Sequence, residues 1–267
     1  MHRAYAPPRP ALSASRRVVR TTMWPMQRPW VLALAAGVIV LLVALALPLL
    51  RMGGMGGAGG SLAGEEGAAG TGLPWQVTRL PEGRAQVFGL EPGRDTLAQV
   101  QARLGDALHV AVVARLGESG ALEALADPFV AGFISGRLVL AFDVPASQLD
   151  AWRAGAASSE PMEGGVRRFK LRAADRQQAV QARLVGLSFI PAVRLTEDDV
   201  RQRFGSPAET VSQPGGAQVM LYPEMGMSIT VAPGQRGVLQ YVAPGDFADR
   251  LRAPLLAASG QAAQPLR

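Results

Sequence analysis

The longest apolar stretch of the chain runs from Val31 to Leu50, twenty residues without a charged or strongly polar side chain. As an α-helix this stretch is about 30 Å long, the thickness of the hydrocarbon core of a bilayer. Trp24 and Trp30 stand near its start, where indole rings favour the membrane interface. The pattern predicts a transmembrane helix over residues 31–50. A cleaved signal peptide is the alternative, because residues 44–46 read Ala-Leu-Ala, a small-x-small pattern.

A second pattern occurs twice, 100 residues apart. Residues 96–105 read Thr-Leu-Ala-Gln-Val-Gln-Ala-Arg-Leu-Gly, and residues 196–205 read Thr-Glu-Asp-Asp-Val-Arg-Gln-Arg-Phe-Gly. Each copy predicts a short amphipathic helix that Thr caps at its start and Gly ends in a left-handed conformation. This interpretation explains every shared residue except Arg103 and Arg203, which either face solvent or pair with an acid on the adjacent sheet.

Alternating and apolar segments after each of these helices predict strands. The predicted strands cover residues 108–116, 129–134, 137–144, 209–212, 217–222, 227–231 and 236–242, with a turn at Ser135-Gly136. Further helices are predicted over 147–153, 175–184 and 246–257, the last with Phe247, Leu251 and Leu255 on one stripe. Each unit is then a helix followed by an antiparallel meander, which is an α+β fold.

Together these patterns divide the chain into five parts. They are a basic cytoplasmic tail at 1–30, the membrane helix at 31–50, a flexible Gly-rich linker at 51–74, a first α+β repeat at 75–170, and a second at 171–267 that includes the C-terminal helix. The linker is mostly Gly, Ala and Ser, a composition that buries too little apolar surface to order itself.

Charge is distributed unevenly along the chain. The formal net charge is +6, yet residues 1–51 hold seven arginines and no acid, which leaves 20 basic and 21 acidic residues beyond Arg51. The folded part therefore lacks the basic surface of a nucleic-acid binder. Arginine before the apolar run predicts a cytoplasmic N-terminus and a periplasmic C-terminal domain, in the inner membrane.

Residues suited to catalysis are scarce. The chain has no Cys, two His and a single lysine, Lys170, so thiol chemistry and Cys-ligated metals are excluded. His109 more often faces solvent on a strand than acts in a triad, and acids are common at helix starts such as residues 197–199. We predict no catalytic residue, cofactor or metal. A carboxylate pair for glycoside hydrolysis remains an open alternative, because its spacing exists only in the fold.

The hairpin around residues 220–227 is the predicted partner-binding site. Met220, Met225 and Met227 crowd it, and Met is frequent on adaptable contact surfaces. The predicted contact residues are Tyr222, Pro223, Glu224 and Met225. The alternative is that they are ordinary core and turn residues. Met220 and Tyr222 share a strand face, so burial of one predicts burial of the other.

Three motifs carry a resemblance to a known fold. Residues 203–207 read Arg-Phe-Gly-Ser-Pro, residues 222–226 read Tyr-Pro-Glu-Met-Gly, and residues 238–242 read Val-Leu-Gln-Tyr-Val before Pro244. They resemble the BamE-type fold of small outer-membrane assembly lipoproteins and tandem-repeat inhibitors, and a family of membrane-anchored proteobacterial envelope proteins. The lipoproteins are anchored through a Cys, which this chain lacks. The resemblance implies a fold used mainly for binding proteins.

The function hypothesis is a noncatalytic scaffold module, tethered to the inner membrane through residues 31–50, that binds another envelope protein. The alternatives are a carboxylate-dependent cell-wall hydrolase and a tethered inhibitor of a periplasmic enzyme.

Overall fold

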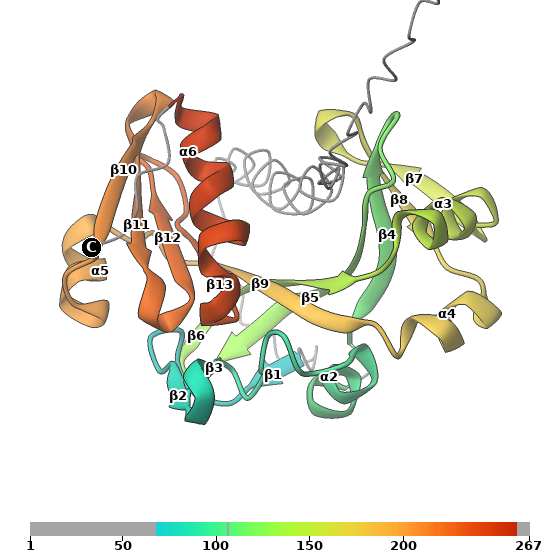
Figure 1. The fold of residues 1–267 in the computed structure, drawn as a ribbon, viewed down its shortest axis with the longest axis horizontal. Coiled ribbons are helices and arrows are strands. Elements are labelled where there is room, and N and C mark those ends of the chain that lie inside the picture. The colour runs from blue at the N-terminus through green and yellow to red at the C-terminus, as the bar shows by residue number, and fades with distance from the viewer. Residues whose placement is uncertain (1–67, 106, 261–267) are drawn as a thin grey trace, which may run out of the picture.

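The computed structural model describes residues 68–105 and 107–260, and in them the chain folds as the α+β structure that the sequence predicts (Figure 1). One large, mostly antiparallel sheet contains β1 Ala68–Gly70, β4 His109–Arg115, β5 Ala121–Ala131, β6 Ile134–Asp143, β7 Ser158–Pro161, β8 Val166–Lys170, β9 Arg183–Pro191, β10 Glu209–Gln213, β11 Ala217–Tyr222, β12 Met227–Val231 and β13 Val238–Val242. The α-helices are α2 Leu97–Leu104, α3 Ala146–Ala154, α4 Ala173–Ala179, α5 Glu197–Phe204 and α6 Ala253–Ser259. A small separate hairpin joins β2 Thr78–Leu80 to β3 Arg84–Gln86.

Two four-stranded meanders lie edge to edge in the large sheet. The strand order is β10-β11-β12-β13-β9-β6-β5-β4, so the chain runs inward from β4 to β9 in one half and inward from β10 to β13 in the other. β9 and β13 join the halves through an antiparallel ladder. β8 and β7 extend the sheet beyond β4, while β1 pairs in parallel with the end of β5.

The helices α2 and α5 begin and end as predicted. The side chains of Thr96 and Thr196 each accept a hydrogen bond from the backbone N–H three residues on. The side chains of those residues, Gln99 and Asp199, accept one from the backbone N–H of the Thr, which completes two capping boxes. Gly105 ends α2 with a φ of 74°, and Gly205 ends α5 with a φ of 81°. Val100 and Val200, at matching positions, are completely buried in the main core. The Thr caps and the positive φ of each glycine are therefore confirmed. The ψ values of −166° at Gly105 and −170° at Gly205 are extended, so the predicted left-handed helical conformation is wrong at both.

Aromatic side chains fill the centre of the main core on one face of the sheet. The ring of Phe88 lies 5.2 Å from that of Phe129, 5.4 Å from that of Phe189 and 5.9 Å from that of Tyr241, all in edge-on geometry. The Tyr241 hydroxyl donates a 2.8 Å hydrogen bond to the carbonyl of Pro74. That bond ties the segment after β1 to the centre of the sheet.

On the other face α6 packs along β10–β13 (Figure 1). The predicted stripe is correct for Phe247 and Leu251 but not for its third member, because Leu256 is buried and Leu255 is only half-buried. A π-helical turn over Ala248–Arg252 is the cause. It inserts one extra residue, so the inward position moves one place along the chain.

The C-terminal end of the predicted linker is part of the fold. β1 pairs with β5, and Pro74 is buried. A Cβ on Gly70 would come within 2.5 Å of the Phe129 ring, so this glycine permits close packing. The predicted boundary at residue 74 is therefore corrected to before Ala68, and the remaining linker residues lie outside the described residues.

The first meander differs from its prediction at two strands. Its turn is Gly132-Phe133, not Ser135-Gly136, and β5 begins as early as Ala121. Asp127 and Pro128 interrupt the hydrophobic run, but a register shift between Ala126 and Phe129 accommodates them within a single strand. The predicted strand 129–134 therefore combines the end of β5 with the first residue of β6.

The central strand β9 was missed. The predicted helix 175–184 ends instead at Ala179 as α4, and Arg183 begins β9. Residues 184–190 are buried on both faces, so apart from Ser188 they form an apolar run without the alternation of a half-buried strand. β9 pairs with β6 over eight residue pairs, so the predicted boundary between residues 170 and 171 separates two strands of one meander.

Within residues 68–105 and 107–260, no helix has the length and apolar character needed to cross a membrane. The predicted tail at 1–30 and the predicted span at 31–50 lie outside the described residues.

Candidate protein-binding surface

The predicted contact residues lie at the turn between β11 and β12, but Tyr222 belongs to the core. Only 4% of Tyr222 is exposed, and its hydroxyl donates a 3.0 Å hydrogen bond to the carbonyl of Gly205. Burial raises the pKa of this hydroxyl. Met220 is buried in the same cluster, as strand alternation predicts. The expectation that Tyr222 presents apolar surface is therefore corrected: it closes the gap between α5 and the sheet.

The rest of that turn offers little apolar surface. Pro223–Met225 form a single 3-10 turn that Gly226 ends with a φ of 61°. Met225 is half-buried against the main core. Glu224 is exposed and pairs at 2.8 Å with Arg79 of β2. The turn thus presents a charged pair to solvent, and its two apolar side chains, Pro223 and Met225, are only partly exposed.

A different group of aromatic side chains gathers around Trp75, just after β1. The Trp75 ring meets that of Phe133 at 6.1 Å and that of Phe204 at 6.4 Å, both edge-on. Phe133, in the β5–β6 turn, is 77% exposed, and Val193 nearby is 53% exposed. We call Trp75, Phe133, Val193, Arg203 and Phe204 the Trp75 surface.

Arg203 completes the Trp75 surface from the last turn of α5. Its guanidinium carbon lies 4.5 Å from the centroid of the Trp75 ring, a cation–π contact. The equivalent Arg103 of α2 instead makes an ion pair with Asp95, whose side chain is buried. The residue before the capping Thr explains the difference. It is Asp95 in the first copy and Leu195 in the second, so Arg203 has no carboxylate at that place.

Between these side chains the surface has only a shallow depression. Its volume is about 10 Å³, roughly the space of one water molecule. It is lined by Pro74, Trp75, Ile134, Phe189, Pro191, Val193, Leu195, Arg203, Phe204 and Leu239. A depression of this size cannot enclose a small molecule, so the apolar side chains around it form a nearly flat surface.

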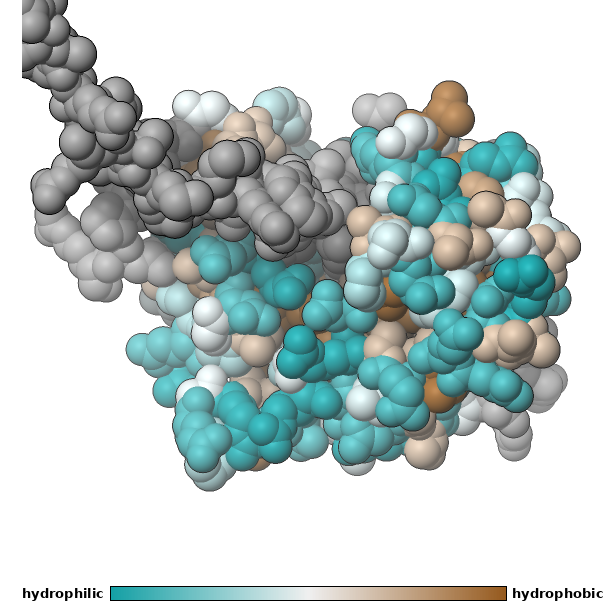
Figure 2. Space-filling model, turned by 45° about the vertical axis from the view of Figure 1, so that its right-hand side comes forward, coloured by the Kyte–Doolittle hydropathy of each residue, from teal (hydrophilic) through white to brown (hydrophobic). Residues whose placement is uncertain are grey.

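The charge beside this depression is positive. Arg203 lines the depression and stands over Trp75, and the exposed Arg194 lies in the chain between two further lining residues, Val193 and Leu195. Among the described residues, neither guanidinium has a carboxylate oxygen within 4 Å. The face drawn in Figure 2 is mainly hydrophilic, with a few strongly hydrophobic side chains among polar ones. An apolar centre with arginine at its rim is typical of protein interfaces.

The described residues bring together little catalytic chemistry. His109 is exposed at the start of β4, and no three His, Asp or Glu side chains of the described chain converge as metal ligands would. Asp199 caps α5, where hydrogen bonds from the Thr196 hydroxyl and backbone lower the pKa of its carboxyl. Glu197 pairs with Arg201 at 3.7 Å. These acids therefore stabilise α5.

Glu123 of β5 is the exceptional carboxyl. It is buried, one of its oxygens has no hydrogen-bond partner among the described residues, and burial raises its pKa to about 8. Ala111 and Ala141 lie opposite it on the neighbouring strands. A glycosidase needs a second carboxyl about 5–10 Å away. The strand positions directly beside Glu123 supply none.

Sequence reasoning missed the Trp75 surface for identifiable reasons. Trp75 was assigned to the start of the first repeat with no role, and Phe133 to the interior of a strand. A bulky aromatic next to Gly132 would have indicated an exposed turn, because Gly132 adopts a φ of 61° there. The contact between residues 75, 133 and 203 depends on the sheet topology, which no local pattern encodes.

No known protein family, curated protein or solved structure matches the chain. The resemblance to the BamE-type fold therefore stays a prediction.

Proposed function

We propose that this chain is a noncatalytic, membrane-tethered protein-binding module of the cell envelope, and that the Trp75 surface holds its partner. One observation carries the proposal: Trp75, Phe133 and Arg203 stand together at the surface in edge-on and cation–π contact. Trp, aromatic and Arg side chains supply most of the binding energy in protein interfaces. Phe133 packs against Trp75 and still leaves 77% of its surface exposed, which favours a role in contact with another protein.

The partner we infer presents an apolar side chain with a carboxylate beside it. The apolar side chain would rest against Phe133 and Val193, and the carboxylate would meet Arg203 or Arg194. Because Arg203 is already held by Trp75, it loses little conformational freedom on binding. An acidic, partly apolar segment of another envelope protein has this chemistry.

The architecture is proposed to be a tandem repeat. α2 precedes the meander β4-β5-β6-β9, and α5 precedes β10-β11-β12-β13. The matching caps of α2 and α5 and the antiparallel contact of β9 with β13 support a duplicated unit. The change from Asp95 to Leu195 then freed Arg203 for the surface and left Arg103 in a structural ion pair.

The proposed location rests on the sequence. The apolar run at 31–50 and the arginines before it support an inner-membrane anchor with the folded domain in the periplasm. A tethered inhibitor of a periplasmic enzyme would use the same surface and differ only in its partner. The hydrolase alternative receives no support from the surroundings of Glu123.

Affinity capture from detergent-solubilised membranes tests the proposal with a matched pair of variants. Phe133→Ser removes an exposed aromatic from the Trp75 surface, and Leu116→Ser removes an apolar side chain that is 95% exposed in the β4–β5 loop. We expect Phe133→Ser to lower partner recovery about tenfold or more, as loss of an interface anchor does, and Leu116→Ser to leave it unchanged. Equal recovery by all three chains would reject the Trp75 surface.

A further inference from the structure

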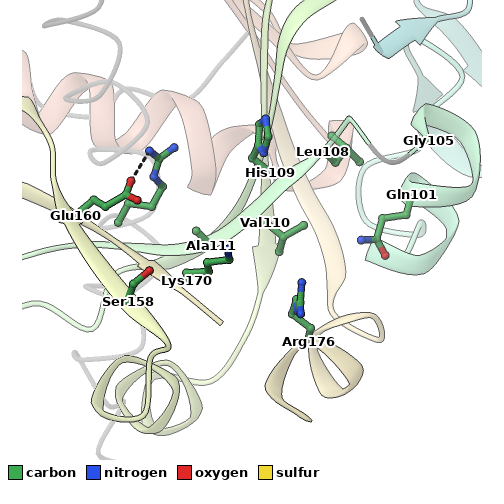
Figure 3. A pocket seen from close by; sticks show the side chains of 11 residues that line it. Gln101, Gly105, Leu108, His109, Val110, Ala111, Ser158, Glu160, Lys170 and Arg176 are labelled. Atoms are coloured by element: carbon green, nitrogen blue, oxygen red, sulfur yellow. Dashed lines mark hydrogen bonds and ion pairs between the residues drawn. The ribbon is translucent and has the colours of Figure 1, made fainter. Parts of the chain in front are cut away.

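A second, unrelated feature is a cavity of about 580 Å³ between α2, α4 and the β4–β8–β7 edge of the sheet (Figure 3). Pockets for small organic ligands typically measure about 300–1,000 Å³. The polar side chains at its wall are Gln101, His109, Ser158, Glu160, Arg168, Lys170 and Arg176. Figure 3 shows Gln101, His109, Lys170 and Arg176 around the same opening, each from a different element.

The fold places these side chains firmly. Lys170, the last residue of β8, lies in register with Ala111 of β4 on one side and Ser158 of β7 on the other. Arg168, two residues earlier, shares its face of the sheet. Arg176 projects from α4, which is anchored by the buried side chain of Ala179. The cations of the cavity thus stand on a strand and a helix, and not on loops.

Positive charge in the cavity exceeds negative charge. Arg168 pairs with Glu160 at 2.7 Å, the dashed contact in Figure 3. Among the described residues, neither Lys170 nor Arg176 has a carboxylate oxygen within 4 Å. Asp106, next to Gly105 in the sequence, lies outside the described residues. The described lining holds three cations, Arg168, Lys170 and Arg176, and one carboxylate, that of Glu160.

The donors suit a compact oxyanion. Lys170 offers three N–H donors, Arg176 a planar fork, and Gln101, Ser158 and His109 can each donate one more hydrogen bond. Several donors that approach from different elements fit a tetrahedral group with acceptors on all sides, and a doubly charged group gains most from two cations. Leu108 and Val110 form an apolar part of the wall, and the volume leaves room for an organic portion.

We propose that this cavity binds a phosphate group, with Lys170 and Arg176 as its main ligands. The group can belong to a soluble phosphomonoester or to the headgroup of an anionic phospholipid. The two sources share the same oxyanion chemistry. This inference does not depend on the Trp75 surface, because the two sites share none of their lining residues.

Calorimetric titration of the full chain in a zwitterionic detergent tests the proposal. Glycerol 1-phosphate and inorganic phosphate are the soluble probes, and dihexanoyl phosphatidylglycerol is the lipid probe, with dihexanoyl phosphatidylcholine as its neutral counterpart. Chloride sets the same ionic strength throughout. Saturation by the soluble phosphates assigns a soluble ligand, and saturation by phosphatidylglycerol but not phosphatidylcholine assigns a lipid headgroup.

Variants decide whether binding is at this cavity. Lys170→Gln and Arg176→Gln should each weaken the dissociation constant about tenfold or more, as expected for a lost charge-assisted hydrogen bond. Both side chains are exposed, so neither change removes core packing. Arg194→Gln, an exposed arginine outside the cavity, should have no effect. The proposal is overturned if no probe saturates, if the double variant binds like the parent, or if Arg194→Gln weakens binding equally.

Discussion

The guanidinium carbon of Arg203 lies 4.5 Å from the ring centroid of Trp75, while Arg103, its counterpart in α2, is engaged with Asp95. Two arginines at matching helix positions therefore have different contacts and different expected roles. One is held by an aromatic ring at the surface, and the other neutralises a buried carboxylate. Their substitution should separate binding from stability.

Replacing Arg203 with Ala should reduce partner capture about tenfold or more, because it removes the cation at the rim of the Trp75 surface. The free energy of unfolding should fall by about 1 kcal/mol or less, the usual value of an exposed cation–π contact. Affinity capture and chemical denaturation of the same preparation measure the two effects.

Arg103→Ala is the matched control and should show the opposite pattern. It leaves the buried Asp95 carboxylate without its ion pair, although the backbone N–H of Glu91 still donates to it at 2.8 Å. We expect a loss of about 1–3 kcal/mol in the free energy of unfolding and unchanged capture. Loss of capture in Arg103→Ala but not in Arg203→Ala would contradict the assignment of the binding surface.

The glycines that end α2 and α5 should respond equally to substitution. Gly105 and Gly205 have φ values of 74° and 81°, and a Cβ on either would meet no atom within 4 Å. The cost of Gly105→Val or Gly205→Val is therefore one of backbone strain alone, and should be about 1–3 kcal/mol at each position, because positive φ with extended ψ is a conformation that only glycine adopts readily. Denaturant unfolding measures it.

Gly245→Ala provides the control for that pair. A Cβ at Gly245 also meets no atom within 4 Å, but its φ is not in the left-handed region. Its substitution should leave stability within about 0.5 kcal/mol. A Gly205→Val chain as stable as the Gly245→Ala chain would show that the positive φ at the end of α5 is not required.

Glu123 should make the stability of the fold depend on pH. Burial raises its pKa from 4.5 to about 8, so the folded state holds this proton more tightly than the unfolded chain. The contribution of protonated Glu123 to the free energy of unfolding is fully present below pH 4.5 and is lost as the pH rises to about 8. The total loss is at most about 5 kcal/mol. Glu123→Gln should remove that decline, and above pH 8 the variant should be more stable than the parent.

Denaturation at several pH values between 4 and 9 measures the difference. Glu118→Gln, a change at an exposed carboxyl in the β4–β5 loop, should keep the pH dependence of the parent. If Glu123→Gln and the parent lose stability in parallel over this range, Glu123 is not the titrating group.

Local signals predicted the helices better than the strands. The caps around Thr96 and Thr196 depend on residues three apart, so sequence alone located both helices within one residue. Strand β9 was missed because burial on both of its faces removes the alternation of apolar and polar residues. Only the end of β5 was predicted, because Pro128 indicates a break in the strand, whereas a register shift accommodates it within β5. Tyr222 shows the limit for sites: its hydroxyl bond to Gly205 depends on how α5 packs on the sheet.

The proposed topology is tested by reporters fused after Arg267. A reporter that works only outside the cytoplasm should be active, because the arginine excess precedes the one long apolar run. A reporter that works only in the cytoplasm should be silent at the same place. The reverse result would reject the periplasmic assignment.

The central claim, that the Trp75 surface binds another envelope protein, is tested most directly by site-specific photocrosslinking in intact cells. A photoreactive side chain at position 133 should yield a discrete crosslinked product with a partner, and the same side chain at position 116, which is even more exposed, should not. The 133 product should disappear when Arg203→Ala is introduced into the same chain. No product from position 133, or the same product from both positions, would contradict the account.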